Sequence, residues 1–479
     1  MTSLLSLSMP APASAPARLS LLAATLALAA CTVGPDHTPP DVTPITPAKW
    51  RWQAAAPRDD APRGEWWRIF NDAELNRLEL LALQNSPSLQ AAAARVDQAR
   101  AAARISTSDW LPDFRLNGSG QREQTSGNLP TPIPVTIPRG RVNSFSTALD
   151  LSYEIDLWGK IRRQVESARA TADSSSASYH NALLTLTGDV AAQYFLLRSA
   201  DAEFDALRRT IALREKFKTL LDDKFKAGAI PETDFARAVT EVATAKAELA
   251  DVKRRRQEAA DTLALLCGQP ASNFSVRQMP ITAKAPPAIP AGLPADMLER
   301  RPDIAAAERT VAARNADIGV AIADYFPAVR LTASGGFLSK EVDSLFSADS
   351  RVWSIGPSVS LPVTGLTVIK YNVRRQKAAR EEAIANYRQA VLTALRDVET
   401  SLGQTRYLAE QAAAVSEALA ASTKATGLIR ESYERGTLSY FEYLDAERTR
   451  LQTELQTAQI SAQRHIATVR LIKALGGGW

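Results

Sequence analysis

The stretch DWLPDFRLNGSG at residues 109–120 returns as DYFPAVRLTASG at residues 324–335. This shift of 215 residues and a second shift of 208 residues match further positions: Pro87 with Pro302, Val96 with Val311, Gly228 with Gly436 and Gly268 with Gly476. A repeat of this length indicates a duplicated structural unit with internal pseudo-symmetry. Such a duplication favours a wall or a tube over an enzyme pocket.

Two stretches alternate between apolar and polar side chains, which is the pattern of a strand with one apolar face. The alternation runs through residues 145–155 and again through residues 353–363. We predict two strands within about residues 113–156 and two within about residues 328–363, each nearly long enough to cross a bilayer. A soluble, half-buried sheet is the alternative.

Four strands are too few to close a barrel in a membrane. Membrane barrels start at about eight strands, and an open edge leaves unpaired backbone groups in lipid. We therefore expect several copies of the chain to supply the missing strands. A dimer would give eight strands, a trimer twelve and a tetramer sixteen, and the pattern does not choose among them.

Each predicted strand pair is followed by a helix of unusual length. Lys160 to Lys226 contains no proline, so it can form a helix of about 100 Å, and residues 370–434 repeat it. Each helix ends near a glycine, Gly228 or Gly436, where we expect the turn at a hairpin tip. The predicted hairpins span about residues 160–267 and about residues 370–475. Helices this long need lateral neighbours, as in a coiled-coil wall.

The apolar run at residues 19–31 is too short to span a bilayer as a helix, so residues 1–30 are predicted to be a signal peptide. The run ends in Leu28-Ala29-Ala30-Cys31, which resembles a bacterial lipobox. In that interpretation Cys31 becomes the first residue and carries a diacylglycerol thioether and an N-acyl chain; cleavage after Ala29 is the alternative. In such lipoproteins the inner-membrane retention signal is an aspartate directly after the cysteine. This chain has Thr32 at that position, so outer-membrane sorting is expected.

Residues 31–70 are predicted to form a lipid-anchored tether and N-terminal segment, because prolines are frequent from Thr38 onward. The tryptophans of this segment either dock onto a surface or pack in a core: Trp50, Trp52, Trp66 and Trp67.

The composition gives no sign of catalysis. The chain has 57 basic and 52 acidic residues, interleaved along its length, so no nucleic-acid partner is expected. Its three histidines lack metal-ligand spacing, and no nucleophile stands near a base in a known arrangement. Cys267, the only other cysteine besides Cys31, is expected to be a buried apolar residue. We therefore expect no enzyme, no catalytic residue, no metal and no cofactor other than the covalent lipid.

Three motifs together resemble one family: ERRPDIAAAE at residues 299–308, with IGVA at residues 318–321; EIDLWGK at residues 154–160; and the stretch at residues 433–447. The chain resembles the TolC-like outer-membrane factors, in particular the NodT-type lipoproteins of RND efflux systems. The internal duplication divides the chain into a first repeat at residues 71–268 and a second repeat at residues 295–479, with a linker at residues 269–294 between them.

The resemblance implies an α+β membrane protein that assembles as a homotrimer. Its twelve-stranded β-barrel, four strands per chain, would continue into a periplasmic α-helical barrel, and the linker at residues 269–294 would lie in an equatorial belt. Such a channel conducts small molecules or drugs passively across the outer-membrane lipid, with a periplasmic adaptor and an inner-membrane RND-type pump as partners. A non-conducting periplasmic coiled-coil structural lipoprotein is the alternative.

The resemblance also implies a gate at the second hairpin tip. Its members narrow the closed periplasmic end with a bulky apolar residue and, one turn later, an aspartate; here these are Phe441 and Asp445, beside Tyr433 and Tyr440. In the internal register Arg237 is the counterpart of Asp445. An Arg237→Ala change is therefore expected to alter conduction less than changes at the second tip.

Overall fold

The computed structural model describes residues 32–51, 64–124, 140–281, 285–290 and 300–477. Its chain contacts form two compact units. The first unit holds residues 1–39, 98–173 and 309–385, and the second holds residues 40–97, 174–308 and 386–479. Each unit is described by itself.

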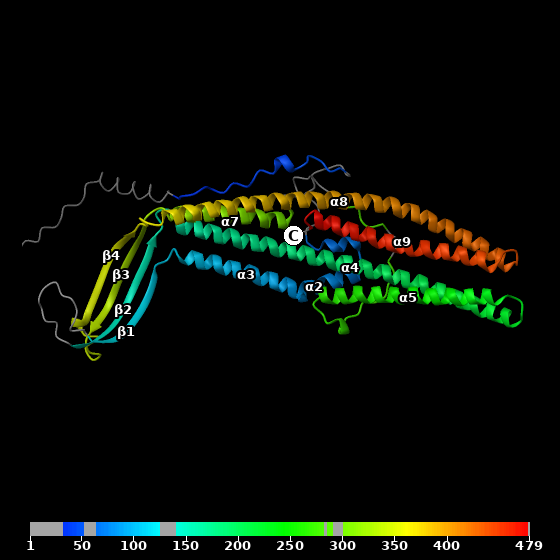
Figure 1. Ribbon diagram of the computed structural model, residues 1–479, viewed down its shortest axis with the longest axis horizontal. Coiled ribbons are helices and arrows are strands. Elements are labelled where there is room, and N and C mark those ends of the chain that lie inside the picture. Colours follow the sequence, from blue (N-terminus) through cyan, green and yellow to red (C-terminus); the bar gives the residue numbers. More distant parts are fainter. Residues whose placement is uncertain (1–31, 52–63, 125–139, 282–284, 291–299, 478–479) are drawn as a thin grey trace, which may run out of the picture. The chain divides into compact units, whose positions relative to one another are not determined.

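The sheet of the first unit has four antiparallel strands in the order β1-β2-β3-β4 (Figure 1). The strands are β1 (Asp113–Gln124), β2 (Arg141–Ile155), β3 (Ala328–Ser339) and β4 (Arg351–Ser360). Within the described residues, β1 and β4 each pair on one side only. β4 ends at Ser360, three residues before the alternation ends at Val363.

The pairing register places most of the large apolar residues of the four strands on one face of the sheet. Leu116 lies opposite Leu149, which lies opposite Gly335, which lies opposite Trp353. The other face is polar, with hydrogen bonds from Asn117 to Asp150 (2.6 Å) and between Ser119 and Ser146 (2.8 Å). The apolar face is solvent-exposed in the single chain, and Trp353 keeps 79% of its accessible surface. This exposure leaves the apolar face without a partner in the described chain.

The helices are α2 (Ala73–Asn85), α3 (Pro87–Ser108), α4 (Lys160–Lys226), α5 (Glu232–Leu266), α7 (Pro302–Ala323), α8 (Leu366–Glu434) and α9 (Tyr440–Ala474). Short 3-10 helices lie at Thr43–Ile45, Trp66–Phe70, Ala271–Asn273 and Ala348–Ser350. A left-handed glycine directly precedes each long helix, Gly159 before α4 and Gly365 before α8. None of the described helices combines the length and hydropathy needed to cross a membrane.

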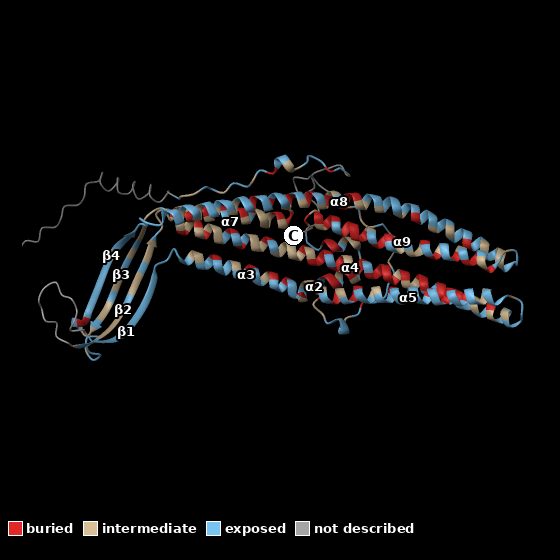
Figure 2. Ribbon diagram, viewed as in Figure 1, coloured by how far each residue is buried: buried red, intermediate tan, exposed pale blue. Residues whose placement is uncertain are grey.

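The main core of the second unit forms where α2 and the Trp66–Phe70 turn pack on α4, α5 and α9. Figure 2 shows buried positions concentrated in α4 and in the C-terminal part of α9. Trp66 and Trp67 are buried in this core, and the Trp66 indole N–H donates to the Thr187 hydroxyl (3.2 Å). These two tryptophans therefore pack in a core rather than dock onto a surface. Trp52 lies outside the described residues.

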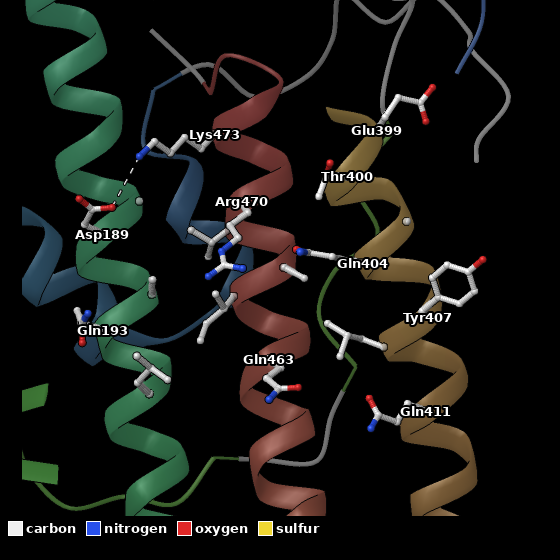
Figure 3. Close-up of a pocket in the computed structure, with 18 of the residues that line it drawn as sticks. Asp189, Gln193, Glu399, Thr400, Gln404, Tyr407, Gln411, Gln463, Arg470 and Lys473 are labelled. Atoms are coloured by element: carbon white, nitrogen blue, oxygen red, sulfur yellow. Dashed lines mark ion pairs between the residues drawn. The ribbon is translucent and has the colours of Figure 1, made fainter. Parts of the chain in front are cut away.

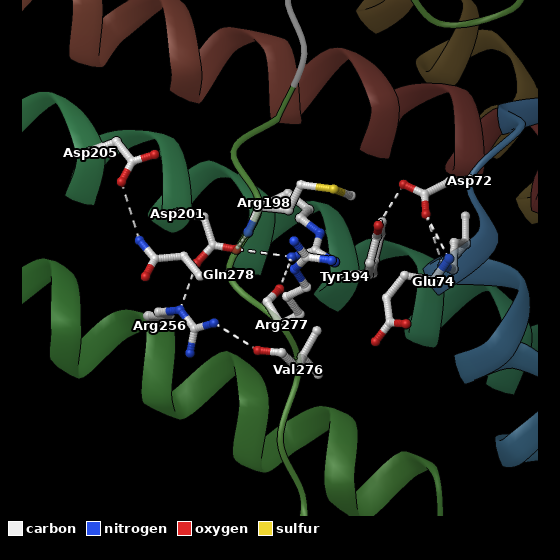
Figure 4. A network of polar contacts seen from close by, with 12 residues as sticks. Asp72, Glu74, Tyr194, Arg198, Asp201, Asp205, Arg256, Val276, Arg277 and Gln278 are labelled. Atoms are coloured by element: carbon white, nitrogen blue, oxygen red, sulfur yellow. Dashed lines mark hydrogen bonds and ion pairs between the residues drawn. The ribbon is translucent and has the colours of Figure 1, made fainter.

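A buried polar network holds the start of the linker at residues 269–294 on the first hairpin (Figure 4). Asp201 of α4 is fully buried; it accepts from Arg256 of α5 (2.6 Å) and from the Met279 backbone N–H (2.9 Å). Arg256 also donates to the Val276 carbonyl (2.9 Å). Hydrogen bonds to charged groups are among the stronger ones, so this network fixes the linker on α4 and α5. Cys267, directly after α5, is buried, and burial raises the pKa of its thiol to about 11.

Candidate functional site

The two hairpin tips turn in the same way. Gly228 and Gly436 have φ angles of 69° and 78°, a left-handed conformation that glycine adopts without strain. The Ala229 N–H donates to the Lys224 carbonyl, and the Thr437 N–H donates to the Ser432 carbonyl, both within 3.0 Å. Each tip is therefore closed by local backbone geometry.

The second tip positions the two predicted gate residues on one helix. Ser439 caps α9, and its capping box with Glu442 starts the helix at Tyr440. Phe441 and Asp445 consequently lie one turn apart on α9. Phe441 is half-buried and Asp445 is exposed.

An aromatic cluster joins the first hairpin to the second near the tips. Phe217 of α4 lies among three tyrosines of the second hairpin, with ring centroids 5.8 Å from Tyr433, 5.2 Å from Tyr440 and 5.2 Å from Tyr443. Burial raises the pKa of Tyr440 and Tyr443. Tyr433 and Tyr440, predicted as gate residues, are thus packing partners of Phe217.

Arg237 contacts the predicted gate directly. Its guanidinium lies over the Phe441 ring, 4.8 Å from the centroid, within the range of a cation–π interaction. The internal register pairs Arg237 with Asp445 in sequence, but in space this arginine lies on the aromatic residue one turn earlier. Arg237 is therefore not an independent control position for Phe441.

Ion pairs also join the hairpins on the body side of the tips. Glu241 of α5 is nearly buried and pairs with Arg214 of α4 (3.1 Å) and with Arg448 of α9. Arg209 of α4 pairs with Glu454 of α9. Burial lowers the pKa of Arg214. The pairs of Glu241 with Arg448 and of Arg209 with Glu454 join the first hairpin to the second.

A cavity of about 1140 Å³, lined by both apolar and polar side chains, lies among α4, α5, α8, α9 and Arg51 (Figure 3). The Arg51 backbone N–H donates to Glu399 (2.8 Å), and Lys473 lies 3.7 Å from Asp189. Four glutamines also line it: Gln193, Gln404, Gln411 and Gln463. The sequence did not indicate this cavity, because its residues come from distant segments with no shared spacing. Among the described residues no cluster of His, Cys, Asp or Glu is placed to hold a metal ion.

The predicted lipidation residue, Cys31, lies outside the described residues. The chain after it is described from Thr32 onward, and Thr32 lies against Gly159 at the start of α4. Sequence reasoning missed Phe217 near the tips and the pair of Glu241 with Arg448 on the body side of the tips. Their only sequence signal is an unremarkable helical spacing, so they could not have been singled out.

An amphipathic four-stranded sheet joined to long helical hairpins is the architecture of outer-membrane efflux channels, and the comparisons place the chain in that class. The family model for outer membrane efflux proteins matches residues 80–269 and 293–477. The chain belongs to this family.

Individual relatives match over nearly their whole length. Outer membrane protein OprJ of Pseudomonas aeruginosa is 32% identical over 96% of both chains. The solvent efflux pump outer membrane protein SrpC of Pseudomonas putida is 30% identical over 95% of this chain and 97% of its own. The solved outer-membrane channel OprN superposes with a TM-score of 0.85 and 31% identity, over 94% of this chain and 100% of that one.

The function follows from this membership. The chain is the outer-membrane channel component of an efflux pump, and its helical hairpins form a periplasmic extension. The TolC-like resemblance and the predicted fold class are confirmed, and the described residues form a four-stranded sheet and two long hairpins.

Proposed function

We propose that three copies of the chain close one twelve-stranded barrel and act as a passive conduit. The observation that carries this proposal is the sheet, whose apolar face is exposed while β1 and β4 each lack a second partner strand within the described chain. Unpaired strand edges are costly in lipid, so neighbouring copies are the simplest source of pairing. The polar face would then line the lumen.

Mass measurement in detergent tests the assembly. We expect a stable complex with the mass of three chains, and a stable dimer or a native monomer would contradict the trimer. Planar-bilayer recordings on the same preparation test conduction, and a complex that never conducts would contradict the conduit.

The remaining partners and the absence of catalysis belong to the same proposal. The channel works with a periplasmic adaptor and an inner-membrane RND-type pump, which supplies the energy, so the chain itself needs no catalytic residue or metal. The likeness to pump components such as SrpC supports this arrangement. Copurification after cross-linking at the hairpin tips tests it, and capture of no second pump component would count against it.

Cys31 is the proposed site of lipid attachment, supported by Leu28-Ala29-Ala30-Cys31. Mass spectrometry of the mature N-terminus should give a cysteine carrying a diacylglycerol thioether and an N-acyl chain. A free Ala30 at the N-terminus would contradict lipidation.

Phe441 and Asp445 are the proposed periplasmic constriction. Their position one turn apart at the start of α9 supports this role, because threefold symmetry would gather each into a ring. A ring of carboxylates favours cations, and an apolar ring hinders wetting.

A further inference from the structure

Residues 32–36, which follow Cys31, lie against the start of α4 and the C-terminal half of α7 in the first unit. The Val33 N–H donates to the Trp158 carbonyl (3.1 Å). Arg163 of α4 donates to the carbonyls of Val33 (3.4 Å) and Gly34 (3.5 Å). Trp158 and Arg163 therefore hydrogen-bond to the backbone of residues 33 and 34, and these bonds do not depend on the side chains of that segment.

The far end of the segment is held as well. Asn315 of α7 is fully buried and donates to the Pro35 carbonyl (2.8 Å), and Arg163 pairs with the Asp36 carboxylate (2.7 Å). Arg163 itself keeps only 4% of its accessible surface. Three successive carbonyls of the segment, from Val33 to Pro35, thus accept from the two buried donors.

Glycines let residues 32–36 approach the start of α4 and the helix α7 closely. A Cβ on Gly159 would lie 2.7 Å from the Thr32 methyl group, and a Cβ on Gly319 would lie 3.0 Å from the Val33 carbonyl oxygen and 2.8 Å from Arg163 Cγ. Gly34 faces Gly319, and a Cβ there would lie 2.5 Å from the Gly319 Cα. Any side chain at these positions must displace the segment or its donor.

The duplicated half of the chain shows that the fold itself does not require these contacts. Gly365 precedes α8 as Gly159 precedes α4, yet a Cβ on Gly365 would meet nothing within 4 Å. In the register of 215 residues, Gly319 corresponds to Arg104 and Asn315 corresponds to Arg100. Asn315 and Gly319 of α7, which contact the N-terminal segment, therefore have no equivalent in the first repeat.

We propose that Trp158, Gly159, Arg163, Asn315 and Gly319 form a binding site for the chain's own residues 32–36, which we call the N-terminal clamp. The clamp fixes the residue next to the lipid-bearing cysteine at the point where β2 passes into α4. The anchor is thereby held beside the sheet, and the lipid and the strands enter the membrane together. This positioning role rests on the proposed lipidation of Cys31.

Hydrogen exchange on the full mature protein tests the clamp. Peptides that contain the Val33 amide should exchange slowly in the parent, and about tenfold faster in Gly159→Ala and Gly319→Ala. Gly365→Ala is the matched control for the first variant, because both glycines have left-handed φ angles, of 78° and 90°. Gly319→Ala favours the helix by removing a glycine, so faster exchange there cannot come from a weakened helix.

Two results would overturn the clamp. One is exchange of this segment in the parent at the rate of an unfolded chain. The other is an equal loss of protection in Gly365→Ala, which would show that the variants act through the helix start and not through Thr32.

Insertions test the positioning role. Thr-Gly-Ser-Gly placed between Cys31 and Thr32 keeps a threonine after the cysteine but lets the lipid move up to about 13 Å from the clamp. We expect it to slow formation of the detergent-stable complex of three chains severalfold, while the same insertion between Thr38 and Pro39 does not. Equal assembly of the two lipidated proteins would overturn positioning alone, whereas a parent without lipid would overturn both positioning and the proposed lipidation.

Discussion

The two hairpin tips share their means of turning but differ in what they present. Each has a left-handed glycine and a stacked aromatic pair: Phe225 with Phe235 in the first tip, and Tyr433 with Tyr443 in the second. These residues correspond in the register of 208 residues. The features that both tips keep are therefore the ones that close a hairpin.

The tips differ at the two proposed gate positions. Phe441 corresponds to Thr233, and Asp445 corresponds to Arg237. Neither position is needed for the turn, since the first tip closes without an aromatic residue or an acid there. Residues of the same kind at matched positions of the two tips therefore maintain the hairpin turn. Phe441 and Asp445, which differ from their matched residues, are not constrained by the turn and can act in the channel.

The stacked pair gives the largest expected effect. Tyr443 is 2% exposed and contacts Phe217, whereas Phe235 is half-buried. Tyr443→Ala should destabilise its tip by about 3 kcal/mol or more, as buried aromatic truncations do, and Phe235→Ala should cost less. Trypsin cleavage after Arg435, compared with cleavage after Lys226, reports the local opening. Equal cleavage in the two variants would break the comparison, because the tips would then be equally packed.

Phe441 gives the next effect, on conduction. Phe441→Ala should raise the resting single-channel conductance severalfold, because it removes the apolar ring. Thr233→Ala at the matched position of the first tip should leave conductance unchanged.

Arg237→Ala sharpens the same test. Its guanidinium lies on the Phe441 ring, so its loss should reproduce part of the Phe441→Ala increase and not the null result of Thr233→Ala. If Phe441→Ala conducts like the parent, the constriction lies elsewhere.

Asp445 gives the smallest effect. Asp445→Ala should reduce cation selectivity, while Thr233→Ala serves again as the unaffected control. Recordings at low salt are required, because the Debye length falls to about 3 Å at 1 M. Unchanged reversal potentials at low salt would remove Asp445 from the constriction.

The strands and turns were predictable because their signals are local. Alternation within β2 and β4 reports a face of a sheet, and Gly228 and Gly436 report a left-handed turn. β4 ends three residues before the apolar alternation does, because alternation reports the face on which side chains lie and not where backbone pairing stops.

The candidate site was only partly predictable. Phe441 and Asp445 could be placed one turn apart on a helix from spacing alone. Their neighbours could not, because Phe217 and Arg237 lie more than 200 residues away in sequence and carry no motif. The internal register even suggested Asp445 as the counterpart of Arg237, whereas the packed hairpins bring Arg237 to Phe441.

The sequence by itself determined the duplication, the amphipathic strands, the long helices and the glycine turns, since each depends on residues close together in the chain. Only the tertiary structure decided which hairpin residues meet and where residues 32–36 bind. Those contacts depend on how separate helices pack, and a buried donor such as Asn315 looks the same in sequence as an exposed one. Its partner, the Pro35 carbonyl, lies 280 residues away, so packing and not sequence pattern brings the two together.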